Sequence, residues 1–108
     1  MSRTAIHPGR HLAAQLKVLG MSAAELGRQL KVPTNRITGI MNGERAITGD
    51  SALRLAHFFG TSPELWLNLQ KLYELRMAEA KAGAVIRKLP QLRESEKLRP
   101  RGTQAKAT

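Results

Sequence analysis

The sequence predicts an all-α protein of five helices followed by a basic tail. Apolar residues recur every three or four positions through residues 1–82, and no segment there shows the sustained alternation of a strand. Helix start signals precede these stretches, and glycine ends several of them. Of the 108 residues, 42% are hydrophobic and 4% aromatic, so we expect one compact domain with a core of Leu, Ile, Ala and Met.

Three short helices are expected first. The first follows Pro8. The second begins after Ser22, which forms a capping-box pattern with Glu25. The third starts at residue 33 or 34 and ends at Asn42, before a glycine. The residues expected to face inward are Leu12, Leu16, Leu19, Ala23, Leu26, Leu30, Ile37, Ile40 and Met41.

Two further helices and a tail complete the prediction. The fourth helix follows the cap Thr48 and stops at Gly60, and the fifth runs over residues 63–82 after the cap Ser62. Leu65, Leu69 and Leu72 are expected to form the core stripe of the fifth helix. Residues 84–92 are predicted as a short strand or an added turn of helix. The basic extension, 83–108, is expected to be disordered from about residue 93.

The charge indicates a polyanionic partner. The chain carries 18 Lys and Arg against 8 Asp and Glu, a net +10, shared equally between residues 1–82 and the extension 83–108. Neutralising phosphates releases counterions, so nucleic acid is the partner that such a balance favours. An acidic protein, or a tail that merely keeps the chain soluble, would need the same charge.

Several function classes are excluded. The absence of cysteine rules out disulfides and thiolate chemistry, and no catalytic motif is present, so we expect neither an enzyme nor a cofactor or small-molecule substrate. His7 and His11 have a spacing that metal pairs use, but we expect capping or packing, and no metal site. No signal-peptide core or membrane-length apolar run is present, which predicts a cytoplasmic protein with no membrane partner.

The segment 22–45 predicts a helix-turn-helix unit, two short helices joined by a tight turn. Its second helix has the size to enter the major groove of DNA, where its first turns reach the base edges. Asn pairs with adenine and Arg with guanine, while Thr meets a base or the thymine methyl. The residues expected to face the bases are Thr34, Asn35, Arg36 and Thr38. The residues expected to neutralise phosphates are Arg28, Arg36, Arg45 and Lys31.

Three stretches resemble one family of such proteins. They read HPGRHL at 7–12, GMSAAELGRQLKVPTNRITGIMNGERAIT at 20–48 and FGTSPELWLNLQ at 59–70. In order and spacing they resemble the HigA-type or VapI-like antitoxins, within the Cro/lambda-repressor-like (XRE) helix-turn-helix family. The resemblance implies a five-helix lambda-repressor-like domain. It also implies an antitoxin that neutralises a RelE/HigB-like mRNA-cleaving ribonuclease and, as a homodimer, represses its own operon at a palindromic operator.

The resemblance also assigns roles by position. Thr34, Asn35 and Thr38 match base-reading positions of the class, and Arg45 matches a position that contacts the DNA backbone. Lys31 stands where a left-handed glycine is usual, at a cost of about 1 kcal/mol, and Gly27 stands where alanine is usual. Gly39 occupies a position where relatives often read a base, and we expect that it lets the helix approach DNA closely.

The fifth helix has more apolar surface than a small bundle can cover. Trp66, Tyr73 and Met77 lie on one stripe, and Val85 and Ile86 follow. These five residues are predicted either to be buried within one chain or to form a dimer or toxin interface. Two other functions remain open: a stand-alone repressor with no toxin, and a toxin-binding protein with little DNA binding.

Overall fold

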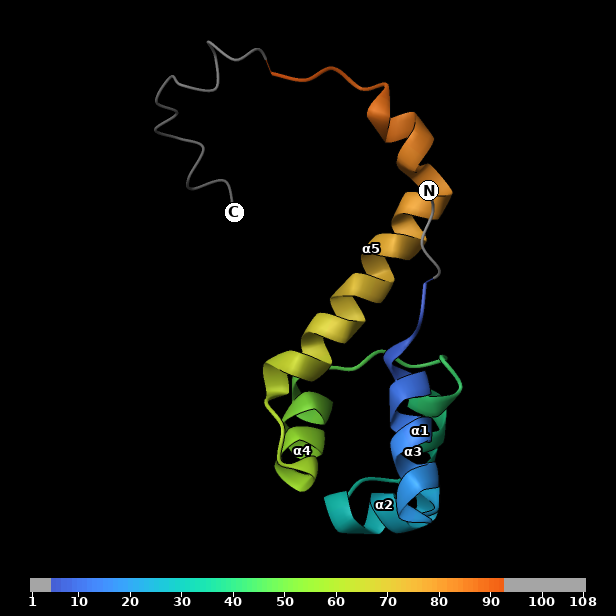
Figure 1. Cartoon of the computed structure of the whole chain (residues 1–108), viewed down its shortest axis with the longest axis vertical. Coiled ribbons are helices and arrows are strands. Elements are labelled where there is room, and N and C mark those ends of the chain that lie inside the picture. Colours follow the sequence, from blue (N-terminus) through green and yellow to red (C-terminus); the bar gives the residue numbers. More distant parts are fainter. Residues whose placement is uncertain (1–4, 93–108) are drawn as a thin grey trace.

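The computed structural model describes residues 5–92, and within this range it contains five α-helices and no strand. The helices are α1 (Pro8–Leu19), α2 (Ala23–Leu30), α3 (Thr34–Met41), α4 (Gly49–Phe59) and α5 (Pro63–Arg87). The first four helices and the start of α5 form a compact body, and the rest of α5 extends away from it (Figure 1). The predicted all-α, five-helix fold is therefore confirmed.

The helices begin where side chains cap them. His7, Ser22, Thr48 and Ser62 each accept a hydrogen bond from a backbone N–H two or three residues later, at 2.9 to 3.3 Å. Such a bond satisfies one of the N–H groups that a helix start leaves unpaired. α3 differs, because it follows Pro33 and has no side-chain cap. The sequence predicted the Ser22, Thr48 and Ser62 caps.

One core holds the body together, and every helix contributes to it. Burial of these side chains supplies the main driving force for folding. The buried apolar residues are Leu12, Leu16, Leu26, Leu30, Ile37, Ile40, Ile47, Ala52, Leu55, Ala56 and Trp66.

α1 and α3 touch through their backbones. A Cβ atom on Gly9 would lie 1.8 Å from the carbonyl oxygen of Ile40, so only glycine fits at this position. The start of α1 is thereby fixed against the end of α3, which is the helix expected to read DNA.

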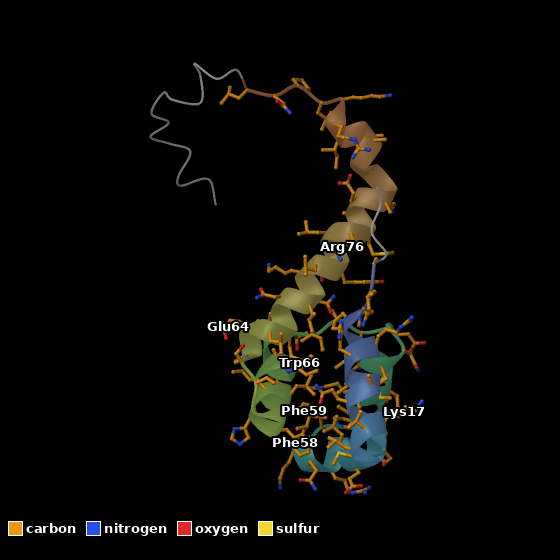
Figure 2. All side chains as sticks on the ribbon, in the orientation of Figure 1. Lys17, Phe58, Phe59, Glu64, Trp66 and Arg76 are labelled. Atoms are coloured by element: carbon orange, nitrogen blue, oxygen red, sulfur yellow. The ribbon has the colours of Figure 1, made fainter. Side chains whose placement is uncertain are left out.

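The core stripe of α5 differs from the prediction. Leu65 and Leu72 are 44% and 46% exposed, whereas Trp66 and Gln70 are 2% and 6% exposed. The Trp66 indole N–H donates to the Thr61 hydroxyl at 3.1 Å. Figure 2 labels Trp66 at the start of α5 and Phe59 at the end of α4, and their ring centroids are 6.0 Å apart. The expected leucine stripe was wrong for Leu65 and Leu72, which point outward because the larger indole takes the central position. Leu69 is partly buried and packs against the core, as predicted.

α5 is also longer than predicted. It continues to Arg87 instead of ending near Ala82, so residues 84–87 extend the helix and do not form a strand. In the part of the chain that the structure describes, no helix is both long enough and apolar enough to cross a membrane. The disorder expected from about residue 93 lies outside the described residues.

Candidate nucleic-acid interface

α2 and α3 form a tight helix pair. Leu26, Leu30 and Ile37 are buried between them, and the N–H of Val32 donates to the Gly27 carbonyl at 2.9 Å to close the end of α2. The turn requires a left-handed residue, and Lys31 takes this conformation with φ 60°. The predicted motif is thus present, with a lysine in the strained position that glycine occupies more easily.

The start of α3 presents polar side chains. Thr34 and Asn35 are exposed, and Thr38 is half-buried one turn later. The Thr38 hydroxyl donates to the Asn35 carbonyl at 3.4 Å, a local bond of the kind threonine makes inside helices. We call these residues, together with Arg36, the α3 face. Asn35 presents its amide to the surroundings of the protein, which is the arrangement that pairing with a base requires.

Arg36 is tied to α4. Its guanidinium donates to Asp50 at 2.6 Å, and Arg54 donates to the same carboxylate oxygen at 2.9 Å. The hydrogen bonds from Arg54 and Arg36 hold the pKa of Asp50 below its ordinary value, because they stabilise the carboxylate. Arg54 also donates to the Leu30 carbonyl at 2.7 Å, which joins α4 to the end of α2. The structure therefore pairs Arg36 within the protein, whereas the sequence suggested a free side chain.

Gly39 is covered by another side chain. A Cβ atom at this position would lie 2.9 Å from Cδ and 3.0 Å from Cγ of Arg45. The backbone N–H groups of Glu44 and Arg45 both donate to the Gly39 carbonyl, at 2.8 and 3.0 Å. Gly39 thus makes room for the stem of Arg45, and the close approach of the helix to DNA at this point stays a prediction.

Arg36 and Arg45 lie on one hollow of about 350 Å³ between α3 and the start of α4. Arg28 and Lys31 are exposed on α2 and the turn that follows it. All four predicted cations therefore belong to the helix pair, its turn and the loop after it. The full lining of the hollow is Arg36, Arg45, Ala46, Thr48, Asp50 and Ser51.

The residues predicted as a partner interface separate into three groups. Trp66 is buried in the core, which leaves its side chain no surface for a partner. Tyr73 is half-buried, with its ring edge-on to His7 at 4.8 Å. Met77, Val85 and Ile86 are 48%, 66% and 54% exposed. Trp66 is therefore a core residue and not an interface residue. Met77, Val85 and Ile86 remain exposed enough to contact a partner.

His7 has a structural role at the start of α1. The Nδ1 atom of His7 accepts from the Gly9 N–H at 2.9 Å, so His7 caps α1. Within residues 5–92 no three His, Cys, Asp or Glu side chains are close enough together to hold a metal ion.

Sequence reasoning missed Asp50, Arg54 and Gln70. Asp50 and Arg54 are four residues apart on a helix, a spacing that signals an ion pair. The contact between Asp50 and Arg36 spans 14 residues, and no local pattern signals it. In the sequence Gln70 looks like an ordinary polar residue of the fifth helix, but its Oε1 accepts a hydrogen bond from the N–H of Ile47 at 2.8 Å.

Comparisons with known proteins place the chain among DNA-binding regulators. A helix-turn-helix family model matches residues 12–66. Virulence-associated protein I of Dichelobacter nodosus is 47% identical over 76 residues, which are 69% of this chain and 70% of that protein.

Solved structures agree in fold over a larger part of the chain. An addiction module antidote protein of the HigA family from Coxiella burnetii is 52% identical with a TM-score of 0.82, covering 84% of this chain and 100% of the other. Pseudomonas aeruginosa antitoxin HigA, solved with the higBA promoter, is 37% identical with a TM-score of 0.79. That match covers 83% of this chain and 100% of the other.

Proposed function

This chain belongs to the helix-turn-helix family, and within it to the HigA-like antitoxins, and from that premise we propose a dual function. As a dimer it represses its own operon by binding a palindromic operator, and it neutralises an mRNA-cleaving toxin of the RelE/HigB type. The matched relatives are named as regulators and antitoxins, which agrees with a protein that is not an enzyme.

The observation that carries the DNA-binding part is the α3 face. Thr34 and Asn35 are exposed at the start of a helix that is held rigidly by α2 behind it and by Gly9 of α1 at its far end. A helix presented in this way reads base edges with its first turns, while cations beside it contact phosphates. Arg28, Lys31 and Arg45 are the cations in that position.

Dimerisation uses the outer part of α5. Leu72, Leu75 and Ile86 lie at heptad positions of α5, with Leu89 just past its end, and they are 46%, 65%, 54% and 54% exposed. Glu79 and Ala82 occupy the heptad positions between Leu75 and Ile86, so the stripe is interrupted, but its exposed apolar surface supports a partner helix. A second copy of α5 supplies one, and a two-fold pair then sets the two α3 helices about 34 Å apart, one turn of DNA.

A promoter titration tests the DNA-binding part. Fluorescence anisotropy compares the chain's own upstream DNA with a scrambled duplex at two salt concentrations. Asn35→Ala should weaken promoter binding by about 1–3 kcal/mol if the amide contacts a base. Asn68→Ala removes the same group from the exposed side of α5 and should leave promoter binding unchanged. Equal binding of both duplexes, abolished by salt, would contradict sequence-specific recognition.

The palindrome has its own test. Footprinting should show two protected half-sites about one helical turn apart. Inserting about half a turn of DNA between them rotates one half-site to the opposite face, so dimer binding should fall to that of a single half-site. Unchanged affinity would contradict a two-fold arrangement of the α3 helices.

The toxin part is tested with the protein encoded next to this chain. We expect a short ribonuclease-like protein that cleaves mRNA alone and stops cleaving when the antitoxin is added in equal amount. The two proteins should also elute together from a size-exclusion column. An unrelated neighbouring gene product that neither cleaves mRNA nor binds would contradict this part and leave a repressor without a toxin.

A further inference from the structure

The loop between α3 and α4 (residues 42–48) carries Arg45, and Arg45 lies along α3 only because the loop takes a particular course. Two consecutive backbone N–H groups of the loop donate to the Gly39 carbonyl. The Arg45 stem then crosses Gly39, so close that a Cβ atom at this position would lie 2.9 Å from Cδ and 3.0 Å from Cγ of Arg45. An exposed arginine has many rotamers, so this contact reduces the conformational entropy that DNA binding would otherwise have to remove.

The loop is fixed from the opposite side by α5. The N–H of Ile47 donates to Oε1 of Gln70 at 2.8 Å, across 23 residues. Both residues are buried, with Ile47 3% and Gln70 6% exposed. The amide of Gln70 donates in turn to Glu74 at 2.9 Å, which sets the orientation of the Gln70 side chain. A buried N–H that loses its acceptor is costly, so this bond strongly favours the observed course of the loop.

A second contact with the loop comes from His7. The His7 ring lies next to Gly43, where a Cβ atom would be 3.8 Å from its Cγ. Tyr73 of α5 packs edge-on against the same ring at 4.8 Å. Both ends of the loop are therefore held by residues outside the helix-turn-helix motif.

We propose that Gln70 is a positioning residue for DNA binding: it holds the 42–48 loop so that Arg45 stays on α3, ready for a phosphate. The inference deepens the proposed function and rests on its assignment of Arg45 to the DNA backbone. It also links the DNA face to α5, because the helix that presents the apolar stripe at one end anchors the Arg45 loop at the other.

The test is a double-mutant cycle on operator binding in the full chain. Gln70→Met keeps the shape of the side chain and removes the acceptor, Arg45→Ala removes the cation, and the cycle includes the double variant. Anisotropy titrations over a salt series give both the affinity and its salt dependence. Gln15→Met, on the exposed side of α1, is the matched control. Circular dichroism fixes a temperature at which all variants are folded.

We expect Gln70→Met to weaken operator binding about fivefold and to lower the slope of log affinity against log salt by about 0.9, the value of one phosphate contact. In the Arg45→Ala background Gln70→Met should have no further effect on either quantity. A general loss of folded protein would lower the apparent affinity and leave the salt slope unchanged.

Three other results overturn something specific. If Arg45→Ala changes neither affinity nor slope, Arg45 is not a DNA contact and that part of the proposed function fails. If Arg45→Ala has its effect but Gln70→Met acts equally in both backgrounds, the positioning role is wrong. If Gln70→Met does not fold, Gln70→Asn replaces it in the cycle, because asparagine keeps a polar amide but is one methylene too short to reach the N–H of Ile47. Additive effects of Gln70→Asn and Arg45→Ala would then overturn the proposal.

Discussion

Both halves of α5 are rich in apolar residues, but the first half packs into the core and the second half leaves its apolar residues exposed. In the first half, Trp66 and Gln70 are buried against α4 and the loop before it. In the second half, Gly83 is the residue that is buried, and the chain's own Glu79–Arg87 ion pair covers it. Figure 1 shows why: α5 begins against α4, and its second half extends beyond the body.

The difference shows that apolar content alone does not decide burial in this helix. Leucines of the first half, such as Leu65, are pushed outward because an indole occupies the centre of the core. Apolar residues of the second half, such as Val85 and Ile86, are exposed among the residues that the structure describes, because this half extends away from the body. The first half thus contributes to folding, and the second half has a surface suited to association.

The largest effect on the free energy of unfolding is expected at the buried first half of α5. Trp66→Ala should lower the free energy of unfolding by about 3–5 kcal/mol, since it removes the largest core side chain and leaves a cavity. Leu65→Ala, one residue earlier and 44% exposed, should cost less than about 1 kcal/mol. Urea denaturation of both variants measures the contrast. Equal losses would mean that Trp66 is not the central core residue of the first half of α5.

The second prediction concerns the exposed stripe. Leu75→Glu should raise the dimer dissociation constant at least about tenfold, because a charge would be buried against the partner helix. Leu53→Glu is the matched control, since Leu53 of α4 is 62% exposed and Leu75 is 65% exposed. Sedimentation equilibrium measures both. A dimer that tolerates Leu75→Glu and is disrupted by Leu53→Glu would move the interface from α5 to α4.

Much of the fold could be predicted from the sequence because its signals are local. Caps such as Ser22 and Ser62, and the spacing of Leu26, Leu30 and Ile37, depend on neighbours a few residues away. The choice between Trp66 and Leu72 as a core residue could not be predicted, because it depends on how α5 meets α4 in three dimensions. The same holds for the end of α5, since Gly83 is a stop signal in the sequence but lies inside the helix, next to the Glu79–Arg87 ion pair.

In the candidate site, too, the local features could be predicted and the contacts between elements could not. The motif placed Thr34 and Asn35 on an exposed helix start, as the structure has them. It could not reveal that Arg36 is paired with Asp50, or that Arg45 fills the space beside Gly39. Both are contacts between elements, and neither follows a helical or strand period.

The third prediction extends the comparison to the body, where one surface residue is strained. Lys31→Gly should raise the free energy of unfolding by about 1 kcal/mol, because glycine adopts φ 60° without a steric penalty. It should also weaken DNA binding and lower the salt slope by about 0.9, since one cation is lost. Lys17→Gly makes the same change within regular α1 (Figure 2) and should destabilise by about 1 kcal/mol. Thermal denaturation separates the two signs.

The smallest effect is expected at the junction of α1, the Arg45 loop and α5. Desolvation lowers the pKa of His7 below its ordinary value of 6.5, and the Arg45 backbone partly opposes this by raising it. The unfolded chain therefore binds the His7 proton more tightly than the folded protein does. The stability linked to His7 is complete above about pH 6.5, and it is lost as the pH falls through the lower folded value.

The pH dependence is measured as the difference between the wild-type chain and His7→Asn. Tyr73 and Arg45 also face the His7 ring, and Arg10 lines a hollow together with His7 and Tyr73, but histidine is the side chain that ordinarily changes charge between about pH 5 and 8. Melting temperatures below pH 6.5 should therefore fall more steeply for the wild type than for the variant. Parallel curves would show that protonation does not disturb the cap on α1, and that the ring holds the Arg45 loop by packing alone.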